Sequence, residues 1–337
     1  MNGRDRVLAH LAGAPVDRLP CMPITMQFAA GLIGVDYLSY ETDYRVLAEG
    51  QLRTAEQFGL DYVNSMSDPA VEAADCGATV VFHADGPAAI DETASLLADK
   101  STLASLKPPA PQDGRRMSNR LQTIQELRRR VGTDLVVEGW IEGPCAEAAD
   151  LRGINRLMVD LYDDPGFVRD LFEFVTPMEI EFARAQVAAG ADMIGIGDAA
   201  ASLIGPRFYR EHAWEYERRM VMAIHAMGAG VRLHICGNTR RICRDMAELG
   251  CDIVDIDFLV PFDAARLESG PACVLLGNMD PVRMLRDGTP DDIASCAAQC
   301  HGAAGARHVV GAGCEVPRDT PHENLAALVR YAHEHVP

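Results

Sequence analysis

Three side chains in the second half of the sequence are of the types that bind zinc. His234 and Cys236 stand two residues apart in GVRLHICG, a run typical of a β-strand, so both side chains point to the same side. A third soft ligand, Cys314, lies far along the chain in GAGCEVP. One imidazole and two thiolates favour zinc, and three protein ligands leave a fourth position open, as catalysis requires. The alternative is that the cysteines are buried thiols and His234 is a hydrogen-bonded core histidine.

Short apolar runs alternate with longer amphipathic stretches, which predicts parallel strands joined by helices. We expect eight strands, at 18–25, 61–69, 134–144, 192–200, 230–237, 251–261, 273–281 and 306–317. Between the strands we expect helices, among them those at 44–58, 116–131, 166–189, 206–227, 240–249, 281–301 and 322–335. Eight such units predict one α/β domain over residues 1–337, a (β/α)8 TIM barrel. An open doubly wound sheet is the main alternative, but no GxGxxG follows the first strand, which favours closure.

Residues 70–115 do not follow this alternation. The stretch VEAADCGATVVFHADGPAAI has the pattern of a small hairpin, and KPPAPQDG has loop composition. We therefore predict an insertion after the second strand, near the barrel mouth.

The carboxyl ends of barrel strands meet at one mouth, so polar residues there are candidates for a site. The three proposed metal ligands all stand at such ends, and this placement favours the metal over the alternative. Glu142 and Asp198 are predicted at the same mouth, where each carboxylate could orient a substrate or shape the field of the metal. The other reading is that they accept hydrogen bonds from loop amides.

The composition excludes several classes of function. A net charge of −18 without a sustained basic cluster argues against nucleic acid or an anionic membrane as partner. The sequence has no window as apolar as a membrane span and no signal peptide, so we expect a cytoplasmic protein. The ten cysteines are then expected to be thiols, some of them bound to metal.

Several motifs resemble the uroporphyrinogen decarboxylase superfamily over nearly the whole chain. They are GPCAEAADLRGINRLMVDLYDDP, GDAAASLIGPRFYREHAWEYERRMV, HICGNT, GNMDP and GAGCEVPRDTPHENL. Within the superfamily, HICGNT paired with GAGCEVP is similar to the HxC...C zinc signature of the cobamide-dependent methyltransferases. Those enzymes move a methyl group from a corrinoid protein to a thiol such as coenzyme M.

The resemblance implies a catalytic role for zinc, which would hold the acceptor thiol as a thiolate. Asp257 stands where related zinc methyltransferases carry an acidic group that can occupy the fourth metal position. It could be that ligand, a partner of the histidine, or a loop-capping carboxylate. The chain has no corrinoid-binding DxHxxG, so a methylcobamide must arrive on a partner corrinoid protein, and the other substrate is a small thiol.

Decarboxylation is not expected, because the decarboxylase branch carries an arginine-rich segment where this chain has MPITMQFAAGLIG, without arginine. Two further alternatives remain open. One is a methyltransferase of the same fold with another acceptor or donor, such as tetrahydrofolate or a direct methyl donor. The other is a non-catalytic zinc-binding or corrinoid-binding protein.

Overall fold

A curled sheet of seven parallel strands forms the centre of the molecule in a computed structural model that describes residues 1–337. In spatial order the strands are β1 (Tyr62–Asn64), β4 (Val136–Glu142), β5 (Met193–Gly197), β6 (Gly230–His234), β7 (Ile253–Ile256), β8 (Leu275–Met279) and β9 (His308–Ala312). Neighbours in the sheet are also consecutive in this series, which is the order a barrel requires.

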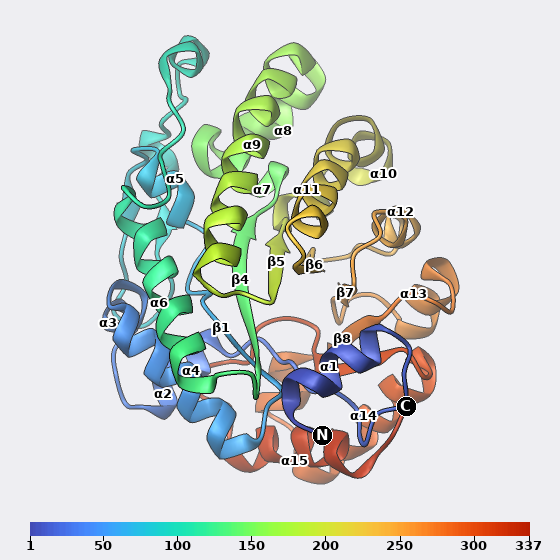
Figure 1. Cartoon of the computed structure of the whole chain (residues 1–337). Coiled ribbons are helices and arrows are strands. Elements are labelled where there is room, and N and C mark those ends of the chain that lie inside the picture. The colour runs from blue at the N-terminus through green and yellow to red at the C-terminus, as the bar shows by residue number, and fades with distance from the viewer.

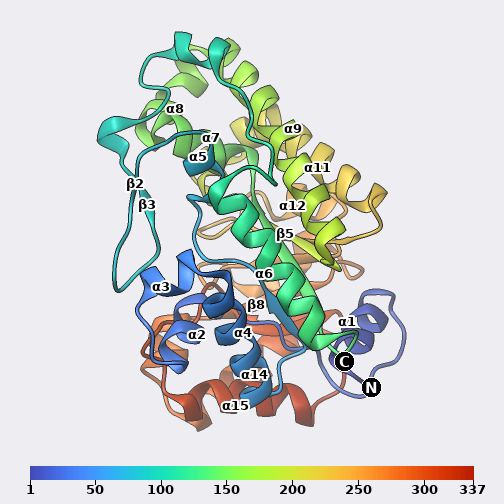
Figure 2. The same cartoon turned by 60° about the vertical axis from the view of Figure 1, so that its left-hand side comes forward.

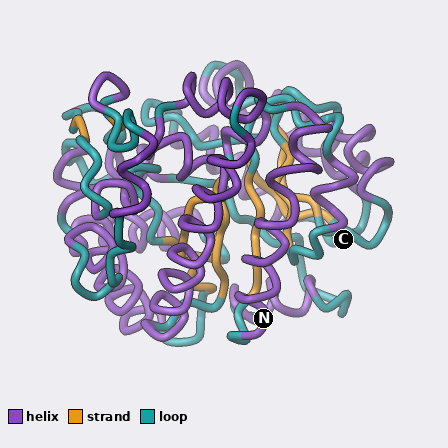
Figure 3. The backbone as a smooth tube through the Cα atoms, turned by 90° about the horizontal axis from the view of Figure 1, so that it is seen from above, coloured by secondary structure: helices purple, strands orange, loops and turns teal.

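Helices surround the sheet (Figure 3). They are α1 (Gly3–Leu11), α2 (Met26–Leu32), α3 (Tyr37–Thr42), α4 (Tyr44–Phe58), α5 (Val71–Asp75), α6 (Arg115–Val131), α7 (Pro144–Arg152), α8 (Ile154–Asp163), α9 (Pro165–Ala189), α10 (Gly205–Phe208), α11 (Trp214–Ala226), α12 (Cys243–Glu248), α13 (Phe262–Ser269), α14 (Pro290–Ala304) and α15 (His322–Glu334). Figure 1 shows α4, α6, α9 and α11 following one another around the outside of the sheet, where they pack on β1, β4, β5 and β6. Every residue of β4, β5, β7 and β9 is buried, as expected for parallel strands covered by helices.

The expected helix at 44–58 is confirmed in type and in bounds. The side chain of Asp43 accepts a hydrogen bond from the amide of Arg45, and Gly59 ends the helix in the left-handed region at φ 77°. These are the capping chemistries that the sequence signals at each end.

The first expected strand, at 18–25, is not a regular strand. Only Cys21 forms a bridge, with Val310 of β9, because Pro20 and Pro23 have no N–H to donate to a sheet. The amide of Val310 donates to the carbonyl of Pro20 (2.8 Å), and the amide of Asp61 donates to the carbonyl of Cys21 (3.3 Å). An irregular segment therefore links β9 to the start of β1, where we expected an eighth strand.

Residues 70–115 contain more structure than one hairpin. They begin with α5 and continue into an antiparallel pair, β2 (Val80–Val81) and β3 (Ala89–Ile90). This pair stands away from the sheet, on the side of α3 (Figure 2). The side chain of Glu41, on α3, accepts a hydrogen bond from the amide of Ala88 (2.9 Å), which fixes the pair there. No helix is both long and apolar enough to span a bilayer.

Candidate metal centre

His234 ends β6 and is held from behind by a buried charge network. Its Nδ1 lies 2.8 Å from Oδ2 of Asp255, the neighbouring residue in the register of β7. Arg232 donates to Asp255 from Nε and Nη2 (2.9 Å each) and forms an ion pair with Glu138 (3.3 Å). The side chain of Arg232 is fully buried. With Nδ1 committed to Asp255, the Nε2 atom of His234 is the one left for a ligand.

The electrostatics of this network favour the charged imidazole. Burial lowers the pKa of His234, but hydrogen bonds to Asp255 and Cys314 outweigh it and raise the pKa to about 10. An ion at Nε2 would therefore replace a proton.

Two cysteines complete the group. Cys314, which follows β9, places Sγ 3.8 Å from Nε2 of His234. A hydrogen bond with Cys314 lowers the pKa of Cys236 despite burial, and the same bond raises the pKa of Cys314. Cys236 is thus the sulfur closer to the thiolate form.

These side chains fit a zinc ion by their chemistry and by one distance. Two ligand atoms of a tetrahedral zinc, one nitrogen and one sulfur, lie roughly 3.6 Å apart, close to the 3.8 Å between His234 and Cys314. A carboxylate behind the histidine is the usual companion of such a site. No group of three or more His, Cys, Asp or Glu side chains in this structure is placed so that it could hold a metal ion.

The three side chains line one end of a cavity of about 190 Å³ at the carboxyl ends of the strands. The rest of the lining is apolar or carboxyl-bearing: Ile24, Met26, Met66, Asp68, Pro69, Trp140, Glu142, Gly197, Ala199 and Glu315. Trp140 fits because Gly195 and Gly197 carry no side chain, since a Cβ there would lie 2.2 Å and 2.9 Å from its ring. The cavity thus combines a soft ligand set with an apolar wall.

Comparison with known proteins identifies the family. The profile of uroporphyrinogen decarboxylase (URO-D) matches residues 2–335. The chain belongs to the uroporphyrinogen decarboxylase family. It is 28% identical to the methylcobamide:CoM methyltransferase MtbA of Methanosarcina acetivorans, over 98% of this chain and 97% of that protein. It is 26% identical to a uroporphyrinogen decarboxylase of Anaeromyxobacter dehalogenans, over 97% and 98%. A solved methyltransferase from Methanosarcina mazei superposes with a TM-score of 0.87 at 25% identity, covering 99% of both chains.

In this member of the family, Glu142 lies where the sequence predicted, in the cavity wall at the end of β4. Its Oε1 accepts from the indole N–H of Trp140 (3.2 Å). Burial, reinforced by nearby carboxylates, raises its pKa well above the ordinary value. Burial therefore favours the neutral form of Glu142, and this form can donate a hydrogen bond into the cavity.

Asp198 is fully buried and does not line the cavity. It accepts from the amides of Ala146 (2.7 Å) and Cys145 (3.3 Å), in the first turn of α7. Burial raises its pKa to about 6. Asp198 is therefore a carboxylate that binds the amides at the N-terminus of α7.

Both carboxylate oxygens of Asp257 likewise accept hydrogen bonds from backbone amides, here in loops. It accepts from Gly237 (2.8 Å), next to Cys236, and from Leu259 (2.8 Å). The carboxylate that contacts His234 is Asp255, for which we predicted no role from the sequence. The sequence did contain a signal for this role, because Asp255 is a charged residue within a buried strand and the neighbouring strand carries an arginine.

A group of buried carboxyl groups behind Glu142 was also missed. Glu72 accepts from the amide of Glu142 (3.4 Å) and shares a hydrogen bond with the side chain of Glu179, whereas neither oxygen of Glu147 has a hydrogen-bond partner. Burial raises the pKa of all three. Burial therefore favours their neutral forms, and no local pattern indicates this, because Glu147 occupies an ordinary first-turn position of α7.

Proposed function

We propose that this chain is a zinc-dependent methyltransferase that moves a methyl group from a methylated corrinoid protein to a small thiol. The observation that carries the proposal is the pairing of His234 Nε2 with Cys314 Sγ at 3.8 Å, inside a cavity, with Nδ1 fixed by Asp255. The similarity to proteins named methylcobamide:CoM methyltransferases supports the same chemistry.

In this proposal His234, Cys236 and Cys314 hold the zinc. A bound zinc lowers the pKa of the acceptor thiol, so that the thiol is present as a nucleophilic thiolate at neutral pH. The residues of the chain position this centre. Asp255 fixes the tautomer of His234, and Asp257 holds the loop that follows Cys236 through the amide of Gly237.

Two other carboxyl groups take supporting roles. Glu142 donates a hydrogen bond to the substrate in the cavity, and Asp198 holds the first turn of α7 beside it. The sulfur of the acceptor then forms a bond to the methyl carbon as the cobalt–carbon bond breaks, and the electron pair stays on cobalt.

The donor and its carrier are also part of the proposal. The chain lacks a corrinoid-binding motif, so the methylcobamide is bound to a partner protein that docks over the barrel mouth. We place the reaction in the cytoplasm.

We also propose that the sheet and the segment 18–25 form a complete (β/α)8 barrel, with residues 70–115 inserted beside its mouth.

The test begins with the metal. Purified protein should hold about one zinc per chain, and His234→Ala and Cys314→Ala should lose it, whereas Cys296→Ala, on α14, should keep it. With free methylcobalamin and a thiol, absorbance should report cob(I)alamin formation by the wild type and by Cys296→Ala only. Full zinc occupancy in both ligand variants would contradict the site.

A second arm separates the two activities named among the relatives. The segment 22–34 has no arginine or lysine to hold the carboxylates of a porphyrinogen. Uroporphyrinogen III should therefore be returned unchanged, and formation of coproporphyrinogen would favour decarboxylation.

A further inference from the structure

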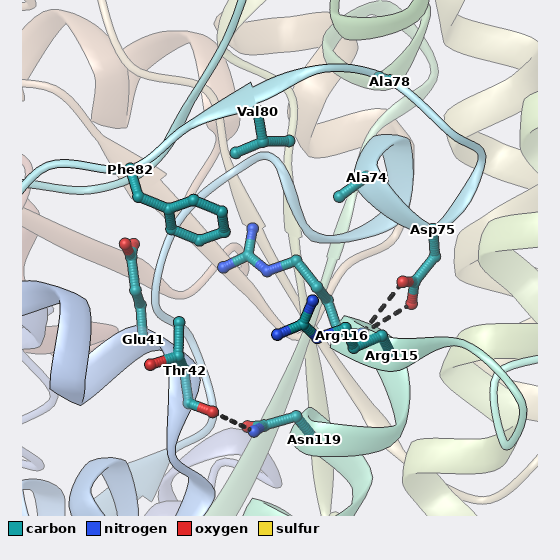
Figure 4. Close-up of a pocket in the computed structure, with 10 residues that line it drawn as sticks. All are labelled: Glu41, Thr42, Ala74, Asp75, Ala78, Val80, Phe82, Arg115, Arg116 and Asn119. Atoms are coloured by element: carbon teal, nitrogen blue, oxygen red, sulfur yellow. Dashed lines mark hydrogen bonds between the residues drawn. The ribbon is translucent and has the colours of Figure 1, made fainter.

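A cleft of about 360 Å³ lies apart from the metal centre, between the segment 70–115 and the helices α3 and α6 (Figure 4). None of the residues that line it also lines the metal-centre cavity. Its volume lies within the roughly 300–1,000 Å³ of small-molecule sites. One wall is apolar and consists of Ala74, Ala78, Val80 and Phe82. The side chain of Phe82 is 43% exposed, so its ring is open to a ligand.

Four charged side chains line this cleft, and two of them are already paired within the protein. Arg116 donates to both oxygens of Asp68 (2.7 Å each), and its guanidinium carbon lies 5.3 Å from the centre of the Phe82 ring. Asp75 accepts from the amides of Arg116 (3.0 Å) and Met117 (2.7 Å), in the first turn of α6 (Figure 4). Neither Arg116 nor Asp75 therefore needs a ligand.

The other two charged side chains, Glu41 and Arg115, are not paired. Glu41 is 1% exposed, and its Oε2 accepts from the amide of Ala88, but its Oε1 has no hydrogen-bond partner. Arg116 and Arg120 lie near this carboxyl, but neither guanidinium donates a hydrogen bond to it. Burial raises the pKa of Glu41 to about 7, so a cationic donor at Oε1 would offset the cost of ionising it. Arg115 is exposed, and its guanidinium has no partner among the residues drawn in Figure 4.

The unpaired acid and the unpaired base lie on two sides of one small opening. Asn119 donates from Nδ2 to the carbonyl of Thr42 (2.8 Å), the residue that follows Glu41. Arg115 lies one turn before Asn119 on the same face of α6, about 6 Å away along the helix axis. One small molecule can therefore contact both Glu41 and Arg115.

We propose that this cleft binds a free α-amino acid with an apolar side chain, whose ammonium group donates to Oε1 of Glu41 and whose carboxylate contacts Arg115. A zwitterion matches the two unpaired groups one for one. A simple anion would instead lie beside Glu41 and Asp75, and a simple cation beside two guanidinium groups. Because Oε1 of Glu41 is covered, the exposed ring of Phe82, which lies beside this carboxyl in Figure 4, turns aside on binding and packs on the ligand. The proposal does not depend on the methyl transfer.

The experiment is calorimetry on the whole chain after treatment with a chelator, so that no zinc can bind the amino acid. L-Phenylalanine should bind with a Kd below about 1 mM. 3-Phenylpropionate lacks the ammonium group and should bind at least about 10-fold more weakly, the effect of losing a hydrogen bond to a charged group. 2-Phenylethylamine lacks only the carboxylate at the exposed arginine and should bind about two- to fivefold more weakly. Glycine has no side chain to pack on the apolar wall and should bind at least about 10-fold more weakly than phenylalanine.

Two variants test the assigned contacts. Glu41→Gln keeps the size and the acceptor for Ala88 and should raise the Kd for phenylalanine by about 10- to 100-fold. Arg115→Met should raise this Kd by about two- to fivefold. Two controls should bind phenylalanine as the wild type does. They are Arg45→Met, at a 71% exposed side chain on α4, and His234→Ala in the metal centre.

Four results would overturn the proposal. They are the absence of phenylalanine binding, equal affinity for phenylalanine and its two fragments, an unchanged Kd in either variant, and loss of binding in His234→Ala, which would place the ligand in the metal centre. Circular dichroism checks that each variant folds. If Glu41→Gln does not fold, the comparison of phenylalanine with 3-phenylpropionate on the wild type decides the role of the carboxyl.

Discussion

Two buried arginines of this protein have opposite surroundings. Arg232, two residues before His234 on β6, contacts two carboxylates, Asp255 of β7 and Glu138 of β4. Arg120, on α6, forms no ion pair with a carboxylate and leaves two nitrogens without a hydrogen-bond partner. Burial opposes the charge of both, but only Arg232 has partners that raise its pKa above the ordinary value.

The difference separates a buried charge that is paired with its neighbours from one that has no ion-pair partner. A fully paired cation can fix the orientation of its neighbours, and Arg232 does so for His234 through Asp255. An unpaired one opposes folding, because the cost of burying its charge is not offset by a partner. The predictions below test this contrast, from the largest expected effect to the smallest.

Replacing Arg232 should have the largest effect. Arg232→Met leaves Asp255 and Glu138 buried without their cation, and we expect a loss of about 3–5 kcal/mol of unfolding free energy. Denaturant unfolding of the metal-free protein at pH 7.5 measures it. The control is Arg244→Met, which breaks only an exposed ion pair with Glu268 and should cost less than about 1 kcal/mol. Equal losses would mean that Arg232 is not part of the scaffold.

The link between the scaffold and the metal is tested at Asp255. Asp255→Asn keeps the size but removes the charge behind His234, so zinc affinity should fall by about 10- to 100-fold. Competition with a chromogenic chelator measures the affinity. Asp252→Asn is the matched control, because Asp252 pairs with the surface His225 instead, and its zinc affinity should equal that of the wild type.

The pH dependence is tested at Glu138. Burial raises its pKa to about 7, although Arg232 opposes the shift. The folded state therefore keeps a proton that the unfolded chain loses above its ordinary pKa of 4.5. Glu138 thus lowers stability progressively as pH rises from about 4.5 through about 7. Within this range, the unfolding free energy of Glu138→Gln should rise relative to that of the wild type by about 1.4 kcal/mol per pH unit. If the difference in unfolding free energy between the variant and the wild type stays constant from pH 5 to pH 7, the raised pKa of Glu138 is contradicted.

The smallest effect on stability is expected at Arg120. Arg120→Met removes an unpaired buried charge, so the unfolding free energy should stay the same or rise by up to about 1 kcal/mol. Thermal and denaturant unfolding without ligand provide the measurement. A loss as large as that of Arg232→Met would place Arg120 in the scaffold and remove the contrast.

Features that depend on neighbouring residues in the chain were predicted correctly from the sequence. The helix at 44–58 follows from its apolar period and its caps, and the family follows from motifs that are contiguous in the chain. Placing His234 and Cys236 on one side of a strand needs only the alternation of side chains. Their approach to Cys314 needs only that strand ends of a barrel meet at one mouth.

Contacts between distant segments were decided by the tertiary structure alone. The partner of His234 depends on the register of β6 against β7, which selects Asp255 and leaves Asp257 to the loop amides. Arg116 and Arg120 are one helical turn apart in RRMSNR, and nothing local distinguishes them. The path of the chain after β1 places Asp68 against Arg116 and leaves Arg120 without a carboxylate partner. The pairing of a buried charge is set by whichever segment folds against it.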